Sequence, residues 1–172
     1  MDDDRNWLEA RDALLAAIES MKCGNRPQMQ SVSVYLRDDS YFTVVIHGSG
    51  GGDPCIASGP VLTLSANTDA RSLGAAILEA LGQSTSTASW PKDWKKVTEP
   101  LLAGANVKTW SAFAKRATNA RVDRTDQTVS VRPSQRDKSS FVDLPDKVIH
   151  LVAPDVTSLG SVVATSLGGR IT

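Results

Sequence analysis

The spacing of hydrophobic residues in the first part of the chain changes from a helical period to a strand period. Apolar residues three or four positions apart predict an amphipathic helix over residues 4–22, which starts in an acidic cluster and has Gly24 just beyond its end. Alternating apolar residues then predict strands over 31–36 and 41–47. Because residues 37–40 between them include two aspartates and a serine, the two strands are expected to form a β-hairpin.

The hydrophobic pattern and the turn residues predict further strands and helices as far as the end of the chain. Residues 48–59 are predicted to form a glycine-rich loop, followed by a strand over 60–64 and a helix over 69–81. A Ser/Thr-rich stretch, 83–89, and a short helix, 108–116, come next. The last part is predicted to contain three strands and one helix, near 120–124, 128–132, 147–152 and 157–167. Short strands followed by helices indicate an α+β domain with a largely antiparallel sheet.

One helix sequence occurs twice. The segment SLGAAILEALG at 72–82 returns as SLGSVVATSLG at 158–168, 86 positions later, and the strand before it, VLTL at 61–64, returns as VIHL at 148–151. Because each copy alone has too little apolar surface to fold, we expect two pseudo-symmetric strand, strand, helix halves packed on each other. The expected single domain consists of an N-terminal helix (1–24), a first half-repeat (31–82), a connector (83–118) and a second half-repeat (119–168).

Each repeated helix carries one apolar stripe that is expected to be buried against the sheet. The stripe residues are Leu73, Ile77 and Leu81 in the first helix and Leu159, Val163 and Leu167 in the second. Gly74 and Gly160 each weaken a helix by roughly 1 kcal/mol relative to alanine, so close approach of a neighbouring strand or helix is expected there. The residues able to cap the helices are Asn67, Thr68 or Asp69 for the first, and Asp155 or Thr157 for the second.

Composition indicates a globular protein with an uneven charge distribution. Apolar residues make up 41% of the 172 residues, and no segment reaches the roughly 18 apolar residues of a membrane span. The acidic N-terminus is unlike a secretory signal, and Cys23 and Cys55 lack metal-binding companions, so the expected location is cytoplasmic. The net charge is zero, yet residues 1–91 have 6 basic and 11 acidic side chains, whereas residues 92–172 have 13 and 8. The amino half therefore suits a basic partner, and the carboxyl half suits phosphate.

No segment has the residue pattern of a familiar catalytic or metal site. The run 48–52 lacks the Gly-Lys-Ser/Thr end of a phosphate-binding P-loop. His47 and His150 fall in predicted strands, and no carboxylate is spaced to orient either one, so a hydrolase using them ranks last among the possible functions. Two acidic pairs are expected to stabilise turns: Asp38 with Asp39, and Asp123 with Asp126. We therefore predict a protein that is not an enzyme and uses no cofactor or metal.

Three segments form a pattern that spans residues 32–167. They are the helix at 73–84 that begins Leu-Gly-Ala-Ala, the Lys-Thr-Trp-Ser-Ala-Phe segment at 108–113, and the second Leu-Gly helix from Ser158. In order and spacing they resemble a family of bacterial contact-dependent growth inhibition immunity proteins. The glycine-rich loop and the N-terminal helix depart from that pattern, in regions where immunity proteins are expected to differ because each recognises its own toxin.

The resemblance implies a small cytoplasmic protein whose partner is the C-terminal toxin domain of a contact-delivered effector. Such a protein neutralises its toxin by binding and performs no chemistry. In related systems the toxin is commonly a nuclease, often one that acts on tRNA. The resemblance implies no membrane, small-molecule or direct nucleic-acid partner.

Acidic and aromatic side chains are the predicted toxin-binding residues. Carboxylates can imitate phosphates in the basic groove of a nuclease, and aromatic anchors supply affinity; covering a surface beside the groove is an equally open mode of inhibition. The predicted residues are Asp38, Asp39, Asp53, Asp69, Glu79, Trp90 and Trp94. For the two tryptophans, the alternative is packing at the interface between the repeats.

A nucleic-acid-binding module is the second hypothesis. Basic residues of the carboxyl half are interleaved with aromatic ones, as in proteins that bind single strands. The basic residues are Lys92, Lys95, Lys96, Lys115, Arg116, Arg121, Arg124 and Arg132, near Trp90, Trp94, Trp110 and Phe113. This hypothesis ranks second because the sequence contains no RNA-recognition or helix-turn-helix signature.

Overall fold

The computed structural model describes residues 28–48, 55–138 and 140–169. The strands in these ranges are β1 (Gln30–Arg37), β2 (Ser40–His47), β3 (Ile56–Ser65), β4 (Ala117–Thr125), β5 (Thr128–Asp137), β6 (Ser140–Asp143) and β7 (Ile149–Val152). The helices are α2 (Ala70–Gln83), α3 (Trp94–Gly104), α4 (Trp110–Ala114), α5 (Val156–Ser166) and a 3-10 turn, η1 (Pro145–Lys147). The predicted helix over 4–22, Cys23 and Asp53 lie outside the described residues.

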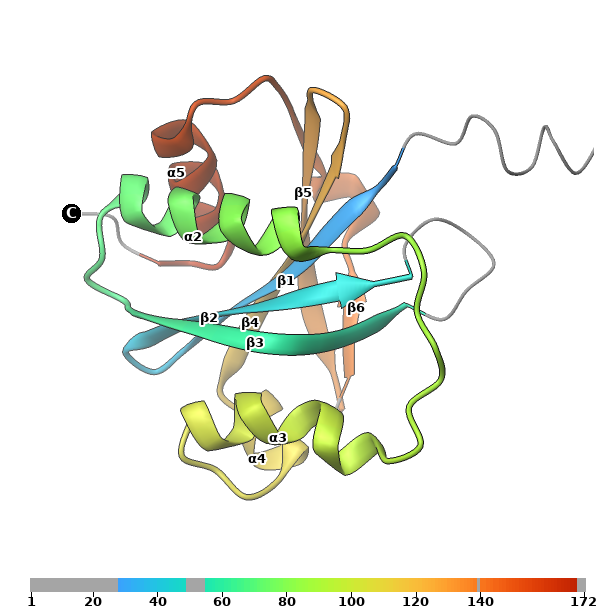
Figure 1. The fold of residues 1–172 in the computed structure, drawn as a ribbon. Coiled ribbons are helices and arrows are strands. Elements are labelled where there is room, and N and C mark those ends of the chain that lie inside the picture. The colour runs from blue at the N-terminus through green and yellow to red at the C-terminus, as the bar shows by residue number, and fades with distance from the viewer. Residues whose placement is uncertain (1–27, 49–54, 139, 170–172) are drawn as a thin grey trace, which may run out of the picture.

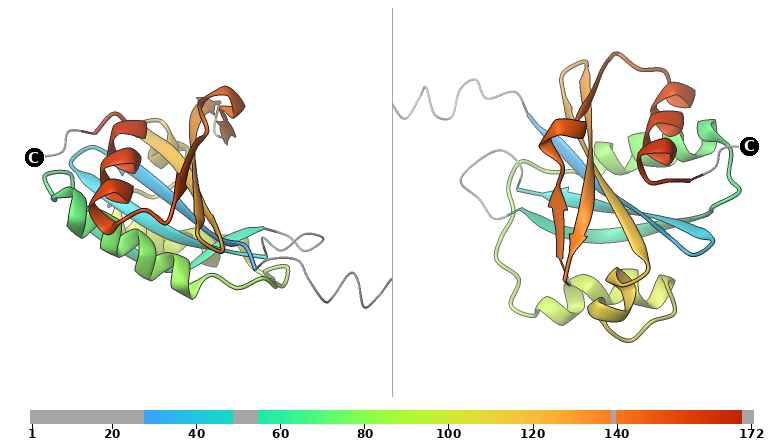
Figure 2. Two further views of the ribbon diagram at one scale, coloured as in Figure 1. Left: turned by 90° about the horizontal axis from the view of Figure 1, so that it is seen from above. Right: turned by 180° about the vertical axis from the view of Figure 1, so that it is seen from behind.

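The strands form one sheet, ordered β3-β2-β1-β4-β5-β6, and β7 also pairs with β5. Their pairings are antiparallel. In Figure 1, α2 and α5 lie above the sheet and α3 and α4 lie below it. Figure 2 shows that the sheet is strongly twisted, so that β5 and β6 run steeply across the direction of β2 and β3. The predicted α+β class with an antiparallel sheet is confirmed.

The predicted hairpin of the first half is β1 and β2, joined by a turn at Asp38 and Asp39. The predicted loop 48–59 is wrong at its end, because β3 already begins at Ile56. The pairing of β3 with β2 shifts register between residues 57 and 61, where Gly59 adopts a φ of 99°. This bulge in an outer strand accommodates both a glycine and a proline, which made the segment resemble a loop.

The connector contains a helix, α3, that the sequence analysis missed, and the predicted helix 108–116 is the shorter α4. Pro100 inside α3 has no N–H to donate to the carbonyl of Lys96, which argues against a helix in sequence reading. The helix forms because the Asp93 carboxylate accepts a hydrogen bond from the Lys95 N–H at its start, and because Leu101 is buried beside β3.

The second half also differs from expectation in two strands. The sequence analysis missed β6, a strand of only four residues, Ser-Phe-Val-Asp, that pairs with the far end of β5. The strand predicted over 147–152 begins later, at Ile149, because residues 145–147 form η1. Both errors arise where few apolar residues mark the strand period.

The sheet face beneath α2 and α5 forms the main core. Alternate strand residues such as Val32, Val34 and Val122 point to this side and are fully buried. The two predicted helix stripes pack against them, and all six of their residues are at most 3% exposed. The predicted burial of both stripes is confirmed.

The opposite face of the sheet is covered only in part. At one end, α3 and α4 bury a mainly aromatic cluster in which Tyr35 contacts the rings of Trp110, Phe113 and Phe141, with centroids 5.3–6.1 Å apart. Such edge-on ring pairs add to the stability gained from burial. The rest of this face carries mostly polar side chains, such as Ser33, Asn119 and Arg121, beside the buried Ile46.

The glycines of the repeated helices lie where α2 and α5 cross. A Cβ on Gly74 would lie 1.9 Å from the carbonyl oxygen of Val156, and a Cβ on Gly160 would lie 1.8 Å from that of Ala70. The predicted close approach is confirmed, and each helix approaches the other. The contact is reciprocal: Gly74 and Gly160 are 86 positions apart, and the residues whose carbonyls they approach, Val156 and Ala70, are also 86 positions apart. Superposition of the complete halves stays a prediction.

Both repeated helices begin with a capping aspartate, Asp69 or Asp155, whose carboxylate accepts a hydrogen bond from the backbone N–H three residues later. Hydrogen bonds from the N–H and hydroxyl of Ser72 lower the pKa of Asp69. Bonds from the hydroxyl and N–H of Ser158 lower the pKa of Asp155. Because the folded-state pKa is the lower one, each charged cap stabilises the fold above the ordinary aspartate pKa, and this stabilisation is lost as the pH falls through the folded value.

We therefore expect Asp155→Asn to be less stable than the parent near neutral pH, with the difference shrinking below about pH 4. Asparagine keeps an oxygen that can cap the helix but lacks the charge. Urea midpoints of both proteins at about pH 7 and about pH 2.5 measure this. An equal difference at both pH values would contradict the assigned role of the charge.

Candidate functional site

The two histidines do not form a site together. His47 lies on β2 and contacts Thr85 Oγ1 through Nδ1 at 2.8 Å, whereas His150 lies on β7 and contacts Ser130 Oγ at 2.9 Å. Three strands of the sheet, β1, β4 and β5, separate β2 from β7. Among the described residues, no group of three or more His, Cys, Asp or Glu side chains has the geometry of a metal site.

The two acidic residues of the β1–β2 turn differ in whether their carboxylates are already paired within the protein. Asp38 adopts a φ of 52° and forms ion pairs with Arg116 at 2.6 Å and Arg37 at 3.5 Å. Asp39 is exposed, and its carbonyl accepts a hydrogen bond from the Ala66 N–H at 2.8 Å. That bond holds the turn against the loop between β3 and α2. Asp39 is therefore the freer carboxylate of the pair.

The other predicted acidic residues lie on α2 or outside the described residues. Asp69 caps the start of α2, near the β1–β2 turn, and Glu79 is exposed farther along the same helix. Figure 1 places the β1–β2 turn and the start of α2 at the left side of the sheet. The structure thus brings Asp38, Asp39 and Asp69 to one end of the molecule.

The exposed tryptophan pair lies at the other end, where α3 begins. Trp90 is 70% exposed and Trp94 is 53% exposed, and their rings meet edge to face with centroids 6.0 Å apart. The alternative that they pack at the interface between the repeats is wrong, because both rings are largely exposed and the two halves meet where α2 crosses α5 and where β1 pairs with β4. Two large exposed aromatic rings in contact are typical of a surface that binds another protein.

Trp94 borders an elongated hollow on the partly covered face of the sheet. One part, about 390 Å³, is mainly apolar and is lined by Val44, Trp94, Val97, Thr98 and Leu101. The adjoining part, about 340 Å³, is more polar and is lined by Ser33, Ile46, Asn119, Arg121, Ser140, Phe141 and Asp143. Residues shared by both parts are Tyr35, Cys55, Ala57 and Trp110. We call the two parts together the sheet hollow.

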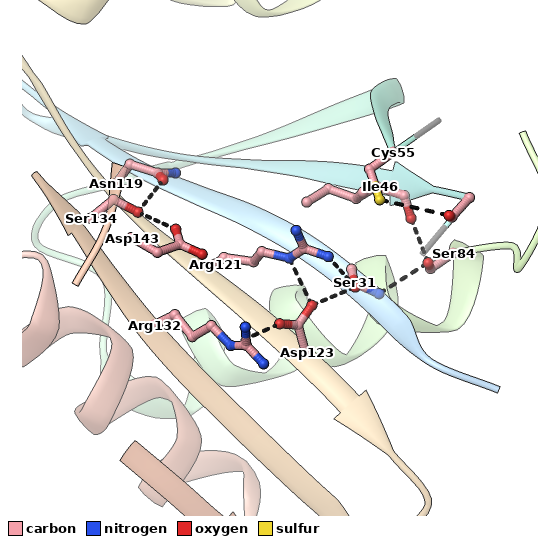
Figure 3. Close-up of polar contacts among 11 residues, drawn as sticks. Ser31, Ile46, Cys55, Ser84, Asn119, Arg121, Asp123, Arg132, Ser134 and Asp143 are labelled. Atoms are coloured by element: carbon pink, nitrogen blue, oxygen red, sulfur yellow. Dashed lines mark hydrogen bonds and ion pairs between the residues drawn. The ribbon is translucent and has the colours of Figure 1, made fainter. Parts of the chain in front are cut away.

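A buried ionic network lies beside the polar part of the sheet hollow (Figure 3). At its centre, Asp123 on β4 is only 4% exposed. Its Oδ1 accepts hydrogen bonds from Arg121 Nε at 2.8 Å and from the Ser31 hydroxyl. Its Oδ2 lies 3.3 Å from Arg132 Nε, an ion-pair distance without the alignment of a hydrogen bond. Two guanidinium groups therefore share one buried carboxylate.

Arg121 is the member of this network that lines the sheet hollow. Burial acts to lower its pKa, but the Asp123 carboxylate and the Cys55 side chain beside it more than offset that effect and raise the pKa above the ordinary arginine value. Its side chain is still 24% exposed. The polar part of the hollow is therefore lined by one permanently charged guanidinium, Arg121, and one carboxylate, Asp143.

The basic residues of the carboxyl half are dispersed over the structure. Arg116 pairs with Asp38, Arg121 and Arg132 pair with Asp123, and Arg124 Nε donates to Gln30 Oε1 at 2.6 Å. A shallow depression of about 730 Å³ beside α3 mixes both charges and is lined in part by Asp93, Lys95, Lys96, Glu99 and Lys108. The sequence analysis had grouped these basic residues as one surface, but the structure does not present them as one.

The sequence analysis missed the sheet hollow and its ionic network. It assigned Asp123 to a turn, which is wrong, because this residue lies within β4; only its predicted companion Asp126 occupies the β4–β5 turn. One signal was present: Asn119, Arg121 and Asp123 alternate with the buried Ala120 and Val122. Three consecutive polar positions on one strand face indicate that this face of the sheet is polar. They do not indicate which residues of the neighbouring strands these side chains contact.

The family model described as CdiI, CDI immunity protein, matches residues 30–158. No curated protein matches the chain in sequence. Among the described residues, none of the helices is long and apolar enough to span a membrane.

Two solved structures have a similar fold. The protein of unknown function NMB0488 from Neisseria meningitidis has a TM-score of 0.69 and 17% identity, over 84% of this chain and 96% of that one. A CdiA-CT/CdiI toxin and immunity complex from Yersinia pseudotuberculosis has a TM-score of 0.65 and 16% identity, over 81% of this chain and 96% of that one.

Proposed function

Because this chain belongs to the CdiI family of CDI immunity proteins, we propose that it binds the CdiA C-terminal toxin domain of its own system and neutralises it. The observation that carries the proposal is the family match, which covers residues 30–158 and so includes all the strands described above. CdiI immunity proteins inhibit toxins and are not enzymes. The protein is therefore proposed to act in the cytoplasm by binding alone.

The proposed toxin-binding surface consists of the sheet hollow and the exposed pair of Trp90 and Trp94 at its apolar end. Exposed aromatic side chains beside a concave surface provide large contact area with little loss of conformational freedom. The polar end of the hollow adds groups that distinguish one partner from another, since a wrong partner leaves them buried and unpaired.

The toxin of this pair is proposed to be a nuclease, and tRNA is the first substrate class to test. A nuclease needs a positively charged groove, which suits the acidic end of this protein. Asp38, Asp39, Asp69 and Glu79 would attract that groove during encounter; Asp53 belongs to the same set by sequence. Because Asp38 is already ion-paired in its turn and Asp69 already caps a helix, the expected contribution of this acidic set is to the association rate.

Asp39→Lys tests the acidic end without breaking the Asp38 ion pairs. We expect association with the toxin domain to slow by about threefold to tenfold at low salt, because attraction becomes repulsion. The difference should shrink at high salt, where such interactions are screened. Stopped-flow or surface-plasmon measurements at two salt concentrations give the rates. Equal rates for parent and variant at both would remove the acidic end from the interface.

Protection of cells tests the proposed function directly. The cognate toxin domain is induced in cells with and without the protein, and growth and tRNA integrity are followed. We expect growth to be restored only when the protein is present, and equally by a variant with both His47 and His150 replaced by alanine. Growth arrest despite a soluble, folded protein would contradict the proposal.

A further inference from the structure

The network beside the sheet hollow has more positive than negative charge. Arg121 and Arg132 bring two guanidinium groups, whereas Asp123 supplies the single buried carboxylate between them. A second carboxylate, Asp143, lines the hollow from β6, where it is exposed and lies 2.9 Å from the Ser134 hydroxyl. The arginine pair is therefore not fully compensated within the network itself.

Arg121 is held in place with part of its hydrogen-bonding capacity unused. A guanidinium has five N–H groups. In the described part of the chain, Asp123 accepts from Nε at 2.8 Å and Ser31 accepts from Nη2 at 3.4 Å. Cys55, which also lines the hollow, is a third hydrogen-bond partner of this side chain. Three partners fix the plane of the group and still leave N–H groups available. An arginine fixed in this way loses little freedom when it binds a further carboxylate.

The surroundings of Arg121 favour such a contact. The aromatic rings of Tyr35, Trp110 and Phe141 line the same part of the hollow. A ligand segment lying in the hollow would exclude water there, and a charge pair is stronger where water is excluded. A cationic ligand would face Arg121 at close range, which is unfavourable, and would have only the Asp143 carboxylate to pair with.

We propose that Arg121 binds an acidic side chain of the toxin, in the polar part of the sheet hollow, and thereby contributes to the choice of toxin. This inference rests on the proposed function. At the acidic end, carboxylates of the immunity protein are proposed to face basic residues of the toxin. In the hollow the charges are reversed: an arginine of the immunity protein faces a carboxylate of the toxin. A toxin without an acidic residue at that place would leave Arg121 unpaired in the interface.

The test compares Arg121→Gln with Arg132→Gln. Each variant removes one of the two guanidinium groups from Asp123, and the stability should fall more for Arg121→Gln, because Arg121 Nε donates a hydrogen bond at 2.8 Å whereas Arg132 makes only an ion pair at 3.3 Å. Only Arg121 lines the hollow. We expect the dissociation constant for the cognate toxin domain to rise at least tenfold for Arg121→Gln and less than threefold for Arg132→Gln. Calorimetry gives the constants, and urea midpoints show that both variants are folded.

A charge exchange identifies the partner residue. We expect Arg121→Glu to bind the toxin more weakly than Arg121→Gln, and one Asp→Lys or Glu→Lys substitution in the toxin to restore binding to Arg121→Glu at least tenfold. Equal affinities of Arg121→Gln and the parent would overturn the inference while leaving the proposed function intact. A strong loss for Asp143→Asn alone would likewise overturn it, by indicating a basic toxin residue. If the parent itself does not bind the toxin, the proposed function and the inference fail together.

Discussion

Gly160→Ala is expected to destabilise the protein by about 3 kcal/mol or more. The new methyl group would lie 1.8 Å from the carbonyl oxygen of Ala70 and 2.9 Å from the Gly74 nitrogen, both of which are backbone atoms of α2. No rotamer change relieves such a contact, so the two helices must separate or tilt. Over-packing of a core costs about 1–3 kcal/mol of stability and sometimes more. A clash with backbone atoms is expected to cost at least the upper value of this range. Separation would also uncover Leu73 and Leu159, which are buried in the same core.

A matched control is available within α2. Gly82 is exposed, and a Cβ built on it meets nothing within 4 Å. Gly82→Ala should therefore stabilise the protein slightly, by up to about 1 kcal/mol, because alanine is the better helix former. Urea denaturation of the two variants and the parent measures both effects. Similar midpoints for Gly160→Ala and the parent would show that the helices do not cross as described.

Trp94→Ala is expected to weaken toxin binding by at least about 30-fold, which corresponds to roughly 2 kcal/mol. The indole is 53% exposed in the free protein, contacts Trp90, and lines the apolar part of the sheet hollow. Its removal would take away contact area at the toxin interface while leaving the two cores intact. The stability of the free protein should therefore change little.

Two controls distinguish a binding anchor from a general effect of exposed apolar surface. Trp94→Phe keeps an aromatic ring and should retain most of the affinity. Val152→Ala changes a residue that is 77% exposed on β7 and outside the hollow, so it should bind like the parent. Calorimetric titration with the toxin domain gives the three dissociation constants. If Trp94→Ala binds as tightly as Val152→Ala, the tryptophan pair is not part of the interface.

The regular elements of the fold followed from local sequence where hydrophobic period and capping residues agreed. The repeated helices are the clearest case, because an apolar stripe, a capping aspartate and a close-contact glycine occur in each. Where the local signals conflicted, the prediction failed. Pro100 concealed α3, and Gly59 with Pro60 concealed the start of β3, since tertiary packing outweighed local preference in both.

The candidate site was less predictable than the fold. Trp90 and Trp94 were predicted from sequence as candidate anchors, with packing between the repeats as the alternative; both are exposed and Trp94 lines the hollow, while their role as anchors stays a prediction. The network around Asp123 was not identified, because Ser31 and Arg121 are 90 positions apart and meet only through the pairing of β1 with β4. Such partners depend on strand register, which the composition of single segments does not specify.

The central claim is that this protein neutralises its toxin by binding it. The most direct measurement is a titration of the purified cognate toxin domain with the full-length protein, with complex formation and toxin activity followed in the same samples. The account predicts a complex with submicromolar affinity and loss of toxin activity in proportion to the amount of complex formed. A toxin that stays fully active at saturating protein, or forms no complex with it, would contradict the account.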